Sequence, residues 1–314
     1  MSLITLFAAP KGFSDPAANL LQRNAIRSWR QLPDVDVLLL GDEPGVAEAA
    51  RELGVRHVAH VKVNPNGVPL ISSMVRLARE TSQSPLLCII NADIILMPDF
   101  AAAVRQLPAL RAGAGLPEQF VFLSRRWDLE VGAPIDFSSG WDQRLRGVAR
   151  VQGSLHKPSG SDFFVFPREC YGDVPDFAIG RAGWDNWMIY RARQQGWPVV
   201  DGTPSVTIIH QNHDYRHLPG GMPHYNHPDT AVNTRLAGGQ AAIRYTILDA
   251  THVLANGRLK RPPASWPRRM RGLELLLRRL LFFLPESTLE RIVRPQRWSK
   301  LLRRRLDKTE SENL

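Results

Sequence analysis

The segment LLCIINADIIL, residues 86–96, joins two apolar runs through the polar stretch Asn91-Ala92-Asp93. The first run, Leu86–Ile90, has the length and composition of a β-strand that is buried on both faces. Such strands are typical of parallel sheets covered by helices, in which ligands bind beyond the carboxyl ends of the strands. Since Asp93 follows the end of this strand, the segment predicts a fold class and the position of a functional site.

The remaining sequence supports an α/β fold with a mostly parallel central sheet flanked by helices. Short apolar runs alternate with segments of helical periodicity in the first hundred residues. The Gly-rich, charged segment 128–151 resembles a substrate-side insertion more than core. We predict strands at 3–8, 35–40, 55–63, 86–90, 120–124, 163–166, 199–200 and 206–209, helices at 19–32, 46–53, 70–80, 185–195 and 237–254, and an irregular loop at 210–227.

The positive charge is concentrated at the end of the chain. The sequence has 40 Lys and Arg against 30 Asp and Glu, and residues 258–314 contain 16 of the basic and 6 of the acidic residues. Residues 1–257 are therefore balanced, so the charge gives no support for nucleic-acid binding by this part. With 44% apolar and 22% charged residues, wholesale disorder is excluded. We predict a globular body at 1–257 and a basic helical tail at 258–314.

The tail separates its basic residues with apolar stretches at 266–271, 273–284, 289–293 and 298–306. These stretches predict amphipathic helices that are too short to span a bilayer but apolar enough to lie at an anionic membrane surface. The alternative is that they pack on the body or on a second subunit.

Cys88 and Cys170 are too few for a disulfide framework or a cysteine zinc site. The N-terminal apolar stretch lacks a basic region and is too short for a signal peptide. We therefore expect a cytoplasmic protein, with peripheral association at the cytoplasmic membrane face as an option.

Two residues predict a divalent metal site. Asp93 at a strand end can hold Mg²⁺ or Mn²⁺ against a diphosphate, although it could also only cap a turn. His210 ends the apolar run 206–209, and one histidine with one carboxylate makes a plausible Mn²⁺ site. Five of the nine histidines lie in residues 210–227, and we expect most of them to be ordinary loop residues. A closed zinc site is the rival interpretation.

Two acids could contact a substrate. Asp185 opens a predicted helix between Trp184 and Trp187, which could stack on a sugar ring or belong to the core. Asp185 itself could be a helix cap. Asp162 follows Gly160 and Ser161, where the glycine allows close approach of a ligand.

The order and spacing of these features resemble the core of GT-A-fold glycosyltransferases over residues 3–254. These enzymes have a DxD-type motif, a glycine loop, an acidic pair opening a helix, and a C-terminal histidine. Here Asn91-Ala92-Asp93 corresponds to the first motif with Asn in place of the first acid. Trp184-Asp185 corresponds to the acidic pair with Trp in place of Glu, and His210 corresponds to the histidine.

The resemblance implies a glycosyltransferase of cell-surface glycan or glycolipid synthesis, with a nucleotide half at about 1–110 and an acceptor half at about 111–257. It implies a nucleotide-sugar donor, a UDP-sugar first of all, and Mn²⁺ or Mg²⁺. In this interpretation Asp93 and His210 hold the metal and Asp185 is the general base. The nucleotide lies near Ala8, Pro10, Asp42, Asn91 and Asp93, and the acceptor, a glycan or lipid-linked, near Gly160, Ser161, Asp162 and Trp184.

Nucleic-acid binding through the tail is a further class, but we expect no nucleic-acid partner, because the tail arginines alternate with long apolar runs rather than polar spacers. Two other functions stay open. A nucleotidyltransferase shares a related core and also needs a divalent metal, but residues 8–12 form a poor version of its phosphate loop. A catalytically inert binding protein of the same fold would explain Asn91 and Trp184.

Overall fold

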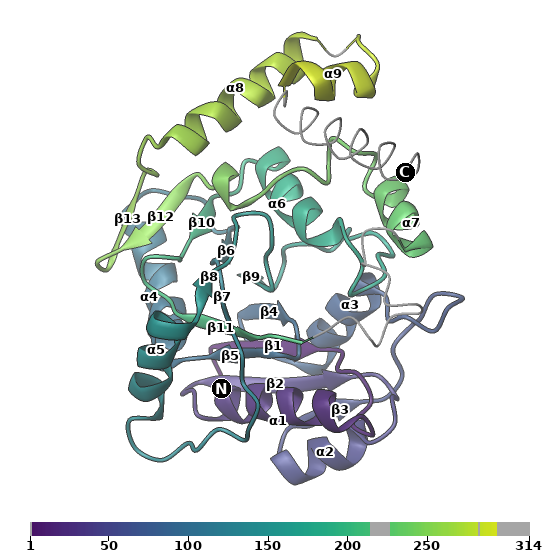
Figure 1. Cartoon of the computed structure of the whole chain (residues 1–314), viewed down its shortest axis with the longest axis vertical. Helices are drawn as coiled ribbons and strands as arrows, with labels where there is room; N and C mark the ends of the chain where they lie inside the picture. Colours follow the sequence, from purple (N-terminus) through teal and green to yellow (C-terminus); the bar gives the residue numbers. More distant parts are fainter. Residues whose placement is uncertain (1, 214–226, 282, 294–314) are drawn as a thin grey trace, which may run out of the picture. The chain divides into compact units, whose positions relative to one another are not determined.

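The computed structural model describes residues 2–213, 227–281 and 283–293. The chain divides into two compact units, Met1–Pro262 and Pro263–Leu314. The first unit contains a nine-stranded sheet (Figure 1), whose strands are, in spatial order, β13 (Arg258–Lys260), β12 (His252–Ala255), β10 (Val199–Asp201), β6 (Val121–Leu123), β9 (Phe163–Pro167), β4 (Leu86–Ile90), β1 (Ile4–Ala8), β2 (Val35–Leu40) and β3 (Arg56–Val58).

The large sheet is mostly parallel. Strands β4, β1, β2 and β3 run parallel to one another, and so do β6, β10 and β12. Strand β9 is antiparallel to both of its neighbours, β4 and β6, and β13 is antiparallel to β12. This confirms the predicted α/β fold with a mostly parallel sheet.

Helices cover both faces of this sheet because its central strands are apolar on both sides. In β4, Leu86, Cys88 and Ile90 belong to one buried cluster, and Leu87 and Ile89 to the other. The first cluster includes residues of α1 (Pro16–Arg30), α2 (Val46–Leu53) and α4 (Pro98–Gly113), and the second includes residues of α3 (Ile71–Thr81) and α6 (Trp184–Gln194).

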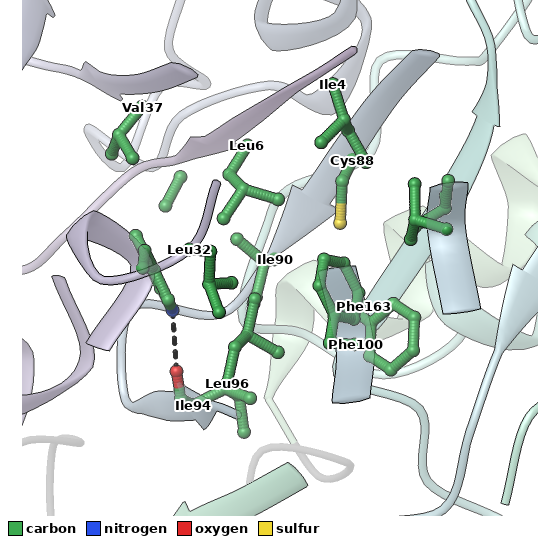
Figure 2. Packing of buried hydrophobic residues seen from close by; sticks show 14 of the residues in the cluster. Ile4, Leu6, Leu32, Val37, Cys88, Ile90, Ile94, Leu96, Phe100 and Phe163 are labelled. Atoms are coloured by element: carbon green, nitrogen blue, oxygen red, sulfur yellow. Dashed lines mark hydrogen bonds between the residues drawn. The ribbon is translucent and has the colours of Figure 1, made fainter. Parts of the chain in front are cut away.

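Figure 2 shows how the first cluster connects the sheet to the chain that follows β4. Phe100 of α4 packs edge-on against Phe163, with ring centroids 5.3 Å apart. The indole nitrogen of Trp29 in α1 donates a hydrogen bond of 2.8 Å to the carbonyl oxygen of Ile94. This bond ties α1 to the residue directly after Asp93.

A second, four-stranded sheet has the order β5 (Ile94–Leu96), β11 (Ile208–Gln211), β7 (Trp127–Leu129) and β8 (Ser154–Leu155). Most of the predicted insertion 128–151 belongs to this region, which also contains α5 (Trp141–Gln152). Ile95, Leu129, Trp141 and Ile209 form its small buried core.

The predicted helix at 237–254 is wrong. The helix lies earlier, in α7 (Pro228–Leu236), and Gly238 and Gly239 follow it with φ angles of 88° and 105°. These left-handed conformations end the helix. The remainder contains a 3₁₀ turn, Ile247–Asp249, and strand β12, which is drawn into the sheet by pairing with β10.

The second unit contains α8 (Trp266–Leu280) and α9 (Glu286–Val293). Strand β13 belongs to the first unit because it pairs with β12, so the division falls after Pro262 rather than after Gly257. The predicted helical stretch 298–306 lies outside the described residues, as do positions 214–226 of the predicted loop. Within the described ranges, no helix is both long and apolar enough to cross a membrane.

Candidate functional site

Several predicted site residues follow the carboxyl ends of neighbouring parallel strands. Ala8 of β1 pairs with Leu39 of β2, and Phe7 pairs with Ile89 of β4. The chain therefore leaves β1, β2 and β4 at one edge of the sheet, where ligands bind in open α/β folds.

Strand pairing in the small sheet brings Asp93 to His210. Ile94 of β5 is in register with His210 of β11, although the two are far apart in the sequence. The Nε2 atom of His210 lies 3.6 Å from Oδ2 of Asp93, and the Nε2 atom of His213 lies 3.0 Å from the same oxygen. One ligand atom from each of the three residues lies within 4.8 Å of the others.

These three side chains fit a divalent cation. The Oδ1 atom of Asp93 is buried and has no hydrogen-bond partner among the described residues. Burial raises the pKa of Asp93, but the hydrogen bond from His213 and electrostatic interactions with His210, His213 and Lys11 lower it overall, so the carboxylate is ionised. Burial lowers the pKa of His210, which keeps its imidazole neutral and able to bind a metal. Two imidazoles and one carboxylate suit Mn²⁺ and other first-row metals.

A chain of charged groups leads from His210 to Asp162. Asp128 lies beside His210, with 3.4 Å between Oδ1 and Nδ1. Arg126 donates to Oδ1 of Asp128 at 2.8 Å and to Oδ1 of Asp162 at 2.6 Å. The side-chain amide of Asn91 also donates to Oδ1 of Asp162, at 2.9 Å. The Oδ2 atom of Asp162 is buried and has no hydrogen-bond partner in the described part of the chain.

Asp185 lies in the first turn of α6, after Gly183 with a φ angle of 106°. Burial raises the pKa of Asp185 to about 6, and the negative charge of Asp162 contributes in the same direction. A carboxyl group with this pKa is ionised at neutral pH and retains useful basicity, which suits a general base.

The structure corrects the prediction for Trp184. Its side chain is only 4% exposed, and its ring packs against Phe164 with centroids 5.6 Å apart. Trp187 is also buried, against Phe177 and Tyr171. Both tryptophans belong to the core, so neither presents a face to a sugar ring.

The other predicted contact residues have different surroundings. Ala8 and Pro10 are buried, so they offer backbone rather than side chains to a nucleotide. Asp42 is exposed and lines a hollow of about 260 Å³ together with His60 and Val61. Gly160 approaches the ring of His156 so closely that an added Cβ atom would lie 3.1 Å from Nε2, and the next residue, Ser161, is buried.

Sequence reasoning missed four residues of this cluster: Arg126, Asp128, His156 and His213. His213 lies in the histidine-rich segment that was recognised, three residues after His210, but its position after a strand gave no reason to prefer it to its neighbours. Asp128 lies in β7 and Arg126 directly precedes this strand, which has three residues and is too short to be recognised by periodicity.

No protein-family model matches the sequence, and no curated protein matches it. Solved structures similar to this chain include a mannosyltransferase from Pyrobaculum calidifontis in complex with GDP-Man and Mn²⁺, at 14% identity and a TM-score of 0.41, over 66% of this chain and 56% of that one. Another is glucosyl-3-phosphoglycerate synthase from Mycobacterium tuberculosis in complex with Mg²⁺ and uridine diphosphate, at 16% identity and a TM-score of 0.38, over 68% of this chain and 72% of that one. At these identities and TM-scores, the function has to be argued from the residues of the site.

Proposed function

We propose that this chain is a glycosyltransferase that moves a sugar from a nucleotide-sugar donor to an acceptor hydroxyl with the help of a divalent metal ion. The observation that carries the proposal is the cluster of Asp93, His210 and His213 at the carboxyl edge of the sheet, with the Oδ1 atom of Asp93 buried and unpaired among the described residues. A carboxyl group with a pKa of about 6, that of Asp185, accompanies this cluster in the same unit.

In this proposal Asp93, His210 and His213 would hold Mn²⁺ or Mg²⁺, which supplies positive charge beside the diphosphate leaving group. Lys11, whose charge interacts with that of Asp93, adds a second positive group for the phosphates. The hollow beside Asp42 would receive the nucleoside part of the donor, with UDP-sugars the first donors to examine.

Asp185 would accept the proton of the attacking hydroxyl. Its charge interacts with that of Asp162, so a proton arriving on Asp185 relieves the repulsion between the two carboxylates. Asp162 would bind a sugar hydroxyl through its unpaired Oδ2 atom, while Asn91 and Arg126 hold its other oxygen.

A thermal-shift screen tests the donor and metal together. UDP, GDP, CDP and dTDP are each added with and without Mn²⁺. A nucleotide present at about 100 times its Kd stabilises the native state by about 2.7 kcal/mol, so one nucleotide is expected to raise Tm only with the metal. Asp93→Asn should abolish this shift, whereas Asp136→Asn, at an exposed acid, should retain it. A metal-dependent shift that survives in Asp93→Asn would contradict the metal assignment.

Turnover then separates an enzyme from an inert binding protein. The sugar conjugate of the nucleotide selected in the screen should release that nucleotide in the presence of Mn²⁺, and Asp185→Asn should slow the release by about 10²–10⁴-fold while nucleotide binding persists. Release of pyrophosphate from a nucleoside triphosphate and a sugar phosphate would instead identify a nucleotidyltransferase.

We also propose that the second unit binds an anionic membrane surface. The exposed apolar side chains of α8 recur at intervals of three and four, which places them on one face. They are Trp266, Met270, Leu273, Leu276 and Leu280, exposed by 41–74%, and Phe283 after the helix is exposed by 68%. Arg271 and Arg278 pair with Glu274 away from this face, at 3.0 and 3.3 Å.

The surrounding charge indicates which partner the apolar face takes. Residues 263–314 contain 13 basic and 6 acidic residues, a net charge of +7, and each basic residue near an anionic bilayer contributes about 1 kcal/mol. Cosedimentation with phosphatidylserine-containing vesicles should therefore exceed cosedimentation with neutral vesicles. A chain that binds neither, or that elutes as a dimer through this face, would contradict membrane binding. If the second unit binds a membrane, a lipid-linked molecule becomes the expected acceptor of the sugar.

A further inference from the structure

The small sheet arranges acids and imidazoles in one row. His210 is in register with Asp128 across β11 and β7, and Asp128 is in register with Ser154 across β7 and β8. Residues opposite one another on neighbouring strands have their side chains on the same face. His156, just after β8, reaches the other oxygen of Asp128 at 2.6 Å. Asp128 therefore lies between two imidazoles.

The resulting chain of contacts ends at a carboxylate on each side. At one end, Oδ2 of Asp93 lies at hydrogen-bond distance from Nε2 of His213, and Oδ1 of Asp93 has no hydrogen-bond partner among the described residues. At the other end, Oδ1 of Asp162 accepts a hydrogen bond from Arg126, and Oδ2 of Asp162 has no hydrogen-bond partner in the described part of the chain. Each terminal carboxylate thus has one oxygen held by protein and one buried oxygen without a hydrogen-bond partner among the described residues.

Stability of the fold is a weak reason for this row of buried polar contacts. Taking a guanidinium and two carboxylates out of water costs several kcal/mol per ion, and apolar residues of similar volume often hold a fold equally well. The side chain of Arg126 is only 16% exposed and that of Asp162 only 5%. We therefore attribute the burial of Arg126, Asp128 and Asp162 to the side chains that they hold in position.

We propose that Asp128 is a positioning residue for His210, and that Arg126 couples it to Asp162. Oδ1 of Asp128 lies 3.4 Å from Nδ1 of His210, a buried nitrogen that has no hydrogen-bond partner among the described residues, and Nε2 of the same ring lies 3.6 Å from Asp93. Carboxylates in this place behind a metal-binding histidine orient its ring. Arg126 holds Asp128 and Asp162 at once, so the histidine on the metal side and the carboxylate on the sugar side keep a fixed relation. This inference rests on the metal site of the proposed function.

A double-mutant cycle tests the inference through metal binding. Free Mn²⁺ is titrated by electron paramagnetic resonance for the full chain, Asp128→Asn, His210→Ala and the double variant. Loss of such a positioning group costs about 10–100-fold in metal affinity. We expect Asp128→Asn to weaken Mn²⁺ binding to this extent in the parent, but by less than about twofold when His210 is already alanine. Asp136→Asn is the matched control and should leave Mn²⁺ affinity unchanged.

The outcomes are distinguishable. An equal loss in both backgrounds, or no loss in either, would overturn the positioning role while leaving the metal site intact. Absence of Mn²⁺ binding by the parent would overturn the metal assignment as well. Nitrogen NMR of the parent chain gives a check that does not depend on the folding of a variant: Nδ1 of His210 should carry the proton, and a proton on Nε2 in the metal-free chain would refute the inference.

Discussion

The environment of Asp185 has a direct consequence for the pH dependence of transfer. Burial raises the pKa of this carboxyl to about 6, so it is protonated below pH 6 and ionised above it. In the proposed function Asp185 is the general base, and a general base acts only when ionised. The rate should therefore fall about tenfold per pH unit below pH 6 and level off above it.

The measurement is kcat/KM between pH 4.5 and 8 for nucleotide release from the donor selected by thermal shift. Since protons compete with the metal for its ligands, Mn²⁺ affinity is measured over the same pH range and its effect on the rate is divided out. The residual activity of Asp185→Asn should lack the acidic limb. An unchanged limb in this variant would assign the titration to another group.

At the scale of single residues, the sequence located the candidate residues relative to strands and helices, whereas the packing of their neighbours was not visible in it. Asp93, His210, Asp162 and Asp185 stand at ends of apolar runs or at a helix start, and such positions are visible in the sequence. Trp184 was misinterpreted because a tryptophan beside an acid has the same pattern whether it faces a ligand or the core. Only packing against Phe164 decides between them.

At the scale of elements, most strands of the large sheet were predictable because they are apolar runs, whereas β12 was predicted as part of a helix and the short, charged β13 was not predicted. The small sheet was not, because its strands have two to four residues and join segments distant in the sequence. Helix α4 was missed because Pro108 interrupts its pattern. The hydrogen bond from Trp29 to Ile94, which anchors β5, also has no signature in the sequence.

That bond leads to a prediction for α1 and β5. Trp29→Phe leaves the carbonyl of Ile94 without its indole donor, so the variant should lose about 1–3 kcal/mol of unfolding free energy in a urea titration. It should also weaken Mn²⁺ binding, because Ile94 follows Asp93. Trp266→Phe, at a side chain that is 74% exposed, is the control and should change neither quantity. Loss of stability with unaltered Mn²⁺ affinity would show that β5 does not depend on this anchor.

At the scale of the whole molecule, the division after Pro262 predicts that the two activities are separable. A chain ending at Pro262 retains every strand of both sheets, so it should unfold cooperatively and keep its metal-dependent nucleotide shift. It should no longer sediment with anionic vesicles. Vesicle binding by the full chain should weaken only partly in high salt, since screening affects the charges and not the apolar face. An unfolded truncated chain would mean that the second unit is part of the body.

The contact between Asn91 and Asp162 predicts the effect of restoring the acid at position 91. Asn91→Asp would place two carboxylates about 2.9 Å apart, where the amide now donates to Oδ1 of Asp162. One of them must then bind a proton, so the variant should have a lower Tm at pH 8 and regain stability as the pH falls toward 5. The exchange Asn91→Asp with Asp162→Asn should recover most of the Tm at pH 8. Equal Tm values of Asn91→Asp and the parent at pH 8 would contradict this account.

The contact between Asn91 and Asp162 also affects how a sequence with an amide at position 91 is interpreted. Along the sequence, position 91 has an amide where the DxD-type motif that this segment resembles has a carboxylate. In the fold, Asp162 lies 71 positions later, directly before the antiparallel strand β9, and places a carboxylate beside Asn91, whose side-chain amide donates to it. The acid and the amide at these two positions can therefore be swapped only if both positions change together. A sequence pattern that requires both acids in one short segment would miss every chain that places one acid beside each of two strands.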